Sequence, residues 1–99
     1  MNFTPGNLYH VYNQGNDKQI IFSCDEDYLI FLRMVRKTIS AHAEIIAYCL
    51  MPNHFHLLIY TDERVTTIIK QGGLLIDSLT NGFRKLLSGY ARIYNKINK

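Results

Sequence analysis

The chain has 99 residues and a mass of 11.5 kDa, which allows one small domain and excludes a second fold. Hydrophobic residues make up 47% and charged residues 19%, a globular composition that excludes a disordered or collagen-like chain. The net charge is +3, but residues 1–79 carry 6 basic and 8 acidic side chains, whereas residues 80–99 carry 5 basic ones and no acid. Such a basic cluster either faces phosphates or complements the C-terminal end of a helix dipole.

Nothing in the sequence predicts a membrane or export segment. The apolar runs at 45–51 and 57–59 are far shorter than the roughly 20 residues of a membrane-spanning helix. The first residues lack the basic start and apolar stretch of a signal peptide. We therefore expect a cytoplasmic protein with no membrane partner. In that reducing compartment, Cys24 and Cys49 are expected to be buried, unpaired thiols.

The first part of the chain predicts a strand followed by a helix. Alternating β-formers predict a strand over 8–14, and Gly15-Asn16-Asp17 predicts its exit turn. Ser23 and Glu26 have the spacing of a capping box, and an apolar stripe follows them, so we expect a helix over about 24–41.

A hairpin and a short helix are predicted next. The β-branched and aromatic content of 43–50 and 54–60 predicts two strands, and the connection 51–53 is so short that they must form an antiparallel hairpin. A short helix is predicted over about 61–71, ended by Gly72-Gly73.

The most regular pattern lies at the C-terminal end. It predicts a helix of about 25 residues over 74–98, with apolar residues three and four apart: Ile76, Leu79, Phe83, Leu86, Tyr90, Ile93 and Ile97. Such a helix is longer than the core of this domain needs, so one expectation is a homodimer packed through it. Gly82 and Gly89 beside the stripe indicate a close helix approach.

The order of these elements is β-α-β-β-α. It predicts an α+β domain of ferredoxin-like layout, with an antiparallel sheet and helices on one face. The final strand of that layout is missing from the prediction.

His54 and His56 are the strongest local signal for chemistry. Residues two apart in a strand point to the same face with Cα atoms about 6.6 Å apart, so both imidazoles can converge on one cation. Phe55 and Leu57 then point the other way, into the core. Two imidazoles still need a third ligand, and two ordinary surface histidines remain the alternative. Core or capping roles are expected for the other histidines, His10 and His42.

Tyr94 is the candidate nucleophile on the C-terminal helix. Tyr94 and Asn98 are four residues apart, so a phenol and an amide oxygen could face one site. An amphipathic tyrosine at a helix edge is the alternative, and Tyr90, in the apolar stripe, is expected to pack. The candidate phosphate contacts on this helix are Arg84, Lys85, Arg92 and Lys96.

Two segments resemble a known family. YHVYNQGNDKQIIF at 9–22 and YCLMPNHFHLLI at 48–59 are similar to the N-terminal blocks of IS200-like, Y1-type tyrosine transposases, especially the branch of REP-associated tyrosine transposases. The second block contains the family's His-hydrophobic-His (HUH) motif as His54-Phe55-His56, preceded by Met51-Pro52-Asn53. The later segment SGYARIYNKIN at 88–98 is similar more loosely.

The resemblance implies cleavage and strand transfer of single-stranded or stem-loop DNA. Family members use the two histidines and a further polar ligand on the tyrosine helix to hold Mg²⁺ or Mn²⁺, which polarises the scissile phosphate. A tyrosine then attacks and leaves a 5′-phosphotyrosine and a free 3′-OH. Carried onto this chain, the family's pattern assigns His54 and His56 as metal ligands and Tyr94 as the nucleophile.

The chain departs from the family at two points. Gln14 stands where relatives usually carry Arg before Gly15-Asn16. The family's Tyr-x-x-x-Asn helix follows a further strand, so Tyr94 comes early by family order, and we expect a domain that is incomplete at its C-terminus. Two alternatives stay open: a truncated or domesticated member that binds DNA without cutting it, and a ferredoxin-like interaction module that dimerises.

Overall fold

The computed structural model describes residues 3–14 and 19–98. Its elements are β1 (Leu8–Gln14), α1 (Asp25–Thr38), β2 (Glu44–Met51), β3 (His54–Tyr60), the 3-10 helix η2 (Glu63–Thr66), β4 (Ile68–Gln71), β5 (Leu74–Asp77) and α2 (Ser78–Ile97). The exit turn predicted at 15–17 lies outside the described residues. Within these ranges, no helix is both long and apolar enough to cross a membrane.

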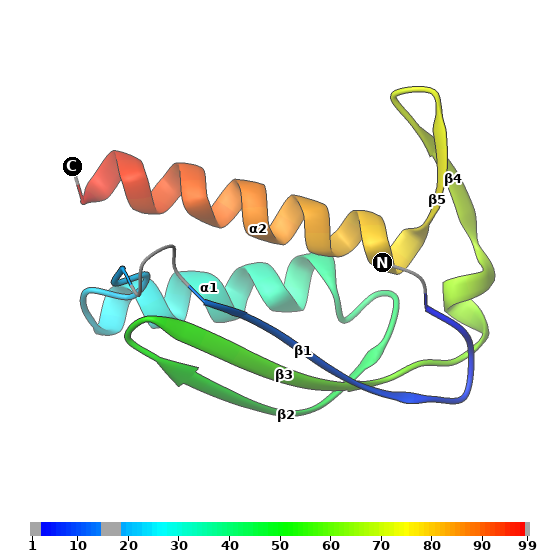
Figure 1. Ribbon diagram of the computed structural model, residues 1–99, viewed down its shortest axis with the longest axis horizontal. Coiled ribbons are helices and arrows are strands. Elements are labelled where there is room, and N and C mark those ends of the chain that lie inside the picture. The colour runs from blue at the N-terminus through cyan, green and yellow to red at the C-terminus, as the bar shows by residue number, and fades with distance from the viewer. Residues whose placement is uncertain (1–2, 15–18, 99) are drawn as a thin grey trace.

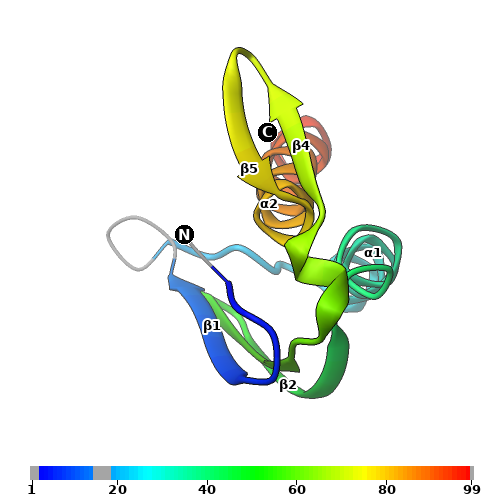
Figure 2. The same ribbon diagram turned by 90° about the vertical axis from the view of Figure 1, so that its right-hand side faces the viewer.

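The first three strands form an antiparallel sheet in the order β1-β3-β2. β3 is the central strand, and α1 carries the chain from one edge to the other, so that β1 and β2 run parallel on either side of it. Both long helices lie on the same face of this sheet, and the described part of the chain leaves the other face open (Figures 1 and 2). The predicted α+β class is confirmed, and the arrangement is compatible with a ferredoxin-like layout.

The core lies between this sheet and the two helices. Alternate residues of β3, Phe55, Leu57 and Ile59, are at most 2% exposed, and they meet Phe31 of α1 and Phe83 of α2. Their neighbours on β3 therefore belong to the open face, because successive strand residues point to opposite sides.

The prediction of a helix over 61–71 is wrong. Only Glu63–Thr66 is helical, and β4 pairs with β5 in a separate hairpin, so the element order is not strictly β-α-β-β-α. Gly72 and Gly73 have φ of 56° and 86°, a conformation that glycine adopts without strain. Two such residues between strands suit a tight hairpin turn, so these glycines form a turn between two strands and do not end a helix.

Because 74–77 belongs to β5, α2 begins at Ser78 and has 20 residues, fewer than predicted. The carboxylate of Asp77 caps it by accepting a hydrogen bond from the Thr80 backbone N–H at 2.7 Å. The apolar stripe is buried from Leu79 to Tyr90, whereas Ile97 is 61% exposed.

The close helix approach that Gly82 and Gly89 predict is confirmed, and the partner is α1 of the same chain. A Cβ at Gly82 would collide with the carbonyl oxygen of Thr38. A Cβ at Gly89 would lie 2.7 Å from the methyl carbon of Met34. Most of the stripe therefore packs within the chain, where a second copy was expected.

Two local predictions around α1 and β2 are also wrong. Cys24 and Cys49 are exposed, because Cys24 is the N-cap residue of α1 and Cys49 lies on the open face of β2. The capping box does not form, since the buried carboxylate of Asp27 accepts the hydrogen bond from the Ser23 backbone N–H at 2.7 Å. The Ser23 hydroxyl is left to contact α2.

Candidate metal and DNA site

His54 and His56 lie side by side on the open face of β3. Both side chains are half-buried, and their ring centroids are 5.0 Å apart with the planes at 90°. As the alternation predicts, Phe55 between them points into the core. Together with Tyr12 and Asn13 the two histidines line a shallow depression of about 490 Å³.

Each of these imidazoles is held through its Nδ1 atom. Nδ1 of His54 lies 2.7 Å from Oδ1 of Asn53, and because an amide oxygen only accepts, the histidine nitrogen donates. Nδ1 of His56 lies 2.7 Å from Nε2 of His10. Among the described residues, neither Nε2 atom of the pair has a hydrogen-bond partner. Metal-binding histidines are commonly arranged in this way, with one nitrogen anchored and the other available.

His10 is part of this cluster and has neither the core role nor the capping role predicted for it. It is exposed on β1, and its ring centroid is 4.9 Å from that of His56. Tyr12, 67% exposed, is the direct cross-strand partner of His56. Strand alternation alone puts His10 and Tyr12 on one face of β1, but only the pairing of β1 with β3 brings that face to the histidine pair.

His54 and His56 could supply two of the ligands that a divalent metal ion needs. Neutral imidazole is the commonest protein ligand for divalent transition-metal ions, and Mn²⁺ would take most of its remaining ligands as oxygens. No set of three His, Cys, Asp or Glu side chains that could hold a metal ion occurs in the described ranges. Cys49 pairs with His56 across β2 and β3 without completing such a set. The remaining positions of an ion bound here would be open to water or substrate oxygens.

Tyr94 lies on the helix-covered side of the sheet. Its ring packs against the core there, and its hydroxyl oxygen is 2.6 Å from Oγ of Ser23. The side-chain amide of Asn98 donates to the backbone carbonyl of Tyr94 at 3.1 Å, so it does not present an oxygen beside the phenol. The structure does not bring Tyr94 together with His54 and His56.

Tyr90, the neighbouring tyrosine of α2, has the packing role that the sequence predicts. It is 7% exposed, and its hydroxyl donates to the carbonyl of Ile21 at 2.6 Å. Burial, aided by the nearby charge of Asp27, raises the pKa of Tyr90 above that of an ordinary phenol. It is therefore a poor source of phenolate.

The two regions approach each other at one end of the sheet. A second pocket of about 190 Å³ lies between α2 and the segment that follows β1, and both Tyr90 and Tyr94 line it. Asn13 lines this pocket and also the depression at His54 and His56. The end of β1 is therefore the boundary between the tyrosine side and the histidine side.

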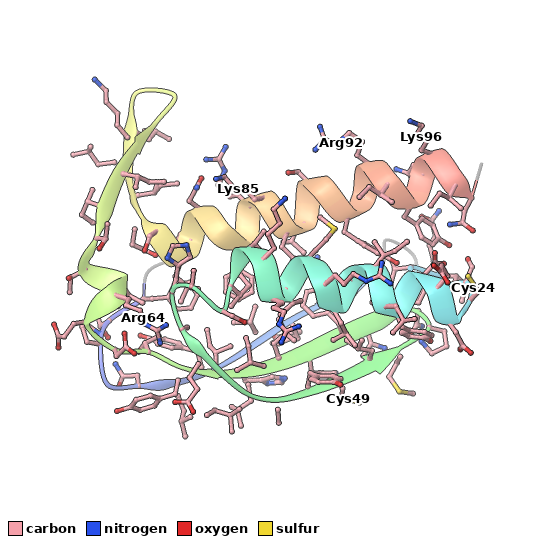
Figure 3. The ribbon with its side chains drawn as sticks, turned by 180° about the vertical axis from the view of Figure 1, so that it is seen from behind. Cys24, Cys49, Arg64, Lys85, Arg92 and Lys96 are labelled. Carbon is pink, nitrogen blue, oxygen red and sulfur yellow. The ribbon has the colours of Figure 1, made fainter. Side chains whose placement is uncertain are left out.

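The basic residues of α2 face away from the sheet. Figure 3 shows Lys85, Arg92 and Lys96 along the outer side of the helix, and all three are exposed. Their spacings of seven and four place them on one stripe, whereas Arg84 lies about 100° around the helix from Lys85. Lys85, Arg92 and Lys96 thus lie on the opposite side of the domain from the histidines.

No protein-family model, curated protein or solved structure matches this chain. The likeness of 9–22 and 48–59 to the transposase blocks therefore rests on the motif residues themselves.

Proposed function

We propose that this chain is a single-stranded DNA processing domain of the IS200-like HUH transposase type. His54 and His56 would hold Mg²⁺ or Mn²⁺, and a bound ion would polarise the scissile phosphate. The observation that supports this proposal most is the anchoring of both HUH imidazoles through Nδ1, which leaves both Nε2 atoms available on an open face. A cytoplasmic location, with access to DNA, is part of the proposal.

In this proposal, the residues around the histidine pair orient the two imidazoles and contact the DNA strand. Asn53 and His10 orient the two imidazoles, and the shallow depression admits an extended strand without a barrier of protein around it. The exposed ring of Tyr12 beside His56 offers a surface on which a base can stack. The basic stripe of α2 adds attraction for phosphates that does not depend on sequence.

Tyr94 stays the proposed nucleophile because of its Tyr-x-x-x-Asn spacing with Asn98. To attack a phosphate at His54, the last turns of α2 must leave Ser23 and pass the end of β1. Ile93 and Ile97 on these turns are 37% and 61% exposed, so the burial that opposes this movement is mainly that of the Tyr94 ring. The hydrogen bond between the hydroxyls of Tyr94 and Ser23 must also break.

Covalent trapping tests this proposal. Stem-loop single-stranded DNA incubated with the protein and Mn²⁺ should give a protein–DNA adduct on a denaturing gel, lost in His54→Ala and in Tyr94→Phe. Tyr12→Phe, which keeps its ring on the open face, is the matched control and should retain the adduct. An adduct that survives in Tyr94→Phe and disappears in Tyr12→Phe would show that the nucleophile is Tyr12 on the open face and not Tyr94.

A second candidate function is DNA binding without cleavage. It is favoured by the separation of the Tyr94 hydroxyl from the histidines on opposite faces of the sheet. It predicts binding of stem-loop DNA that weakens steeply with salt and gives no adduct with any divalent ion.

A homodimer through the C-terminal helix is a further part of the partner proposal. Within the described chain, the stripe leaves Ile93 and Ile97 as its exposed members, so a dimer would have to use the C-terminal end of α2. Sedimentation of the wild type and of Ile93→Lys distinguishes a dimer from a monomer.

A further inference from the structure

We infer that His10 is a positioning residue for His56: its Nε2 accepts the Nδ1 proton of His56 and keeps the Nε2 lone pair of His56 directed at the site. The inference rests on the proposed function in one respect, namely that this lone pair binds a metal ion. The location of the proton, however, is a property of the chain that can be measured without metal or DNA.

The geometry of the pair is that of an in-plane hydrogen bond. Nε2 of His10 and Nδ1 of His56 are 2.7 Å apart, and the two ring planes differ by only 16°. Two imidazoles that are nearly coplanar and meet edge to edge through these atoms have centroids close to the 4.9 Å observed. The shared proton therefore lies along the lone-pair direction of the accepting nitrogen, where a hydrogen bond is strongest.

One of these two nitrogens donates and the other accepts. If His10 donated, neutral His56 would carry its own proton on Nε2, and that N–H would repel a cation. If His56 donates, its Nε2 has a free lone pair, which is the state of a metal ligand. Asn53 imposes this second state on His54, because its amide oxygen can only accept. His10 gives His56 the same state, so both members of the pair present Nε2.

The sheet keeps His10 in place for this role. His10 pairs with Leu58 across β1 and β3, one step along the same face from the Tyr12–His56 pair. The Tyr12 ring lies beside it, with centroids 5.1 Å apart. His10 is exposed on the open face and contributes nothing to the buried core, so its substitution should leave the fold intact.

The first test reads the proton position on metal-free protein labelled with ¹⁵N, at a pH where the imidazoles are neutral. Long-range ¹H–¹⁵N spectra should show His56 with its proton on Nδ1. His10→Phe keeps a planar ring but removes the acceptor, and we expect the proton of His56 to move to Nε2. His10→Gln supplies an amide oxygen as acceptor and should restore the wild-type signature, while His42→Gln is the control for a histidine elsewhere in the chain.

A wild-type His56 protonated on Nε2, or a His56 signature that His10→Phe leaves unchanged, would overturn the inference. The second readout is Mn²⁺ binding by calorimetry, with a roughly 10- to 100-fold loss of affinity expected in His10→Phe and rescue in His10→Gln. If wild-type protein takes up no Mn²⁺, the proposed function fails, and the spectra still decide the role of His10.

Discussion

The hydroxyl of Tyr94 near the end of α2 lies 2.6 Å from Oγ of Ser23, just before α1 begins. This contact ties the last turns of α2 to the helix-covered side of the sheet and turns the proposed nucleophile away from His54 and His56. The pair is exposed, and such a hydrogen bond contributes only about 0.5–1.5 kcal/mol.

Removing the Ser23 hydroxyl should therefore speed adduct formation. In Ser23→Ala the Tyr94 hydroxyl has no hydrogen bond to break before it moves. The activation free energy of adduct formation should fall by the free energy of that hydrogen bond, which gives a rate about 2- to 10-fold higher. Initial rates of adduct formation on stem-loop DNA with Mn²⁺ measure this. Ser88→Ala, which removes a hydroxyl bonded to the Arg84 carbonyl on the same helix, is the control. A slower reaction in Ser23→Ala would mean that Tyr94 reacts from its present position or that another residue attacks.

Asn53 should control metal affinity through His54. Asn53→Ala removes the acceptor for Nδ1 of His54, and loss of such an outer partner commonly weakens metal binding about 10- to 100-fold. Asn53→Asp keeps an acceptor oxygen and should bind Mn²⁺ at least as well as the wild type. Calorimetric titration with Mn²⁺ compares the three proteins, with Asn95→Ala on the exposed part of α2 as control. Equal affinities in Asn53→Ala and the wild type would exclude an orienting role.

Gly82 and Gly89 should respond differently to the same substitution. A Cβ at Gly82 meets backbone of α1, which cannot move aside, so Gly82→Ala should lower the free energy of unfolding by about 1–3 kcal/mol. A Cβ at Gly89 meets the end of the flexible Met34 side chain, and alanine gains about 1 kcal/mol of helix propensity, so Gly89→Ala should be near neutral. Urea denaturation measures both variants. A neutral Gly82→Ala would show that the helices are packed less closely than the structure indicates.

Asp62 should titrate at unusually low pH. The side-chain and backbone hydrogen bonds from Arg64 lower the pKa of Asp62 from 3.8 to about 2. Because the folded-state pKa is below the unfolded one, the stabilisation is present above about pH 4 and is lost as the pH falls toward 2. NMR titration of the Asp62 carboxyl should show its pKa moving back toward 3.8 in Arg64→Gln, with Lys70→Gln as control. An unchanged titration in Arg64→Gln would contradict this pairing.

The basic stripe of α2 should contribute to DNA affinity and to its salt dependence. Replacing Lys85, Arg92 and Lys96 together by Gln removes three phosphate contacts, and the slope of log affinity against log salt should fall by about 2 for a single strand. The matched control removes the same charge from α1 by Arg33→Gln, Arg36→Gln and Lys37→Gln. Fluorescence anisotropy at several salt concentrations gives both slopes. Equal losses of DNA affinity and of salt slope in the two triple variants would show that net charge matters and that the position of the stripe does not.

Local spacing in the sequence determined much of the framework. The alternation in 8–14, the β-branched and aromatic content of 54–60 and the apolar period of 24–41 predicted β1, β3 and α1 to within a few residues. The three-residue connection at 51–53 required the hairpin of β2 and β3. The period of two also placed His54 and His56 on one face, because that relation depends only on neighbouring residues.

The hairpin of β4 and β5 was missed because capping residues followed by Gly72-Gly73 suit a short helix and its end as well as a turn between strands. The same local ambiguity affected Cys49, since nothing in 43–50 says which face of the strand the helices will cover. At β4 the deciding interaction is its antiparallel pairing with β5 across the two glycines. At Cys49 it is the packing of the helices on one face of the sheet, which leaves Cys49 on the other face.

Only the tertiary structure decided the composition of the site. The sequence determined that the chain carries two histidines on one strand face and a C-terminal helix with tyrosines, but not which faces of these elements meet. Pairing of β1 with β3 brings His10 to His56, and packing of α1 and α2 on one face of the sheet separates Tyr94 from both HUH histidines. The physical reason is that strand and helix periods fix how neighbouring side chains point, whereas burial of the core side chains selects which surfaces are covered.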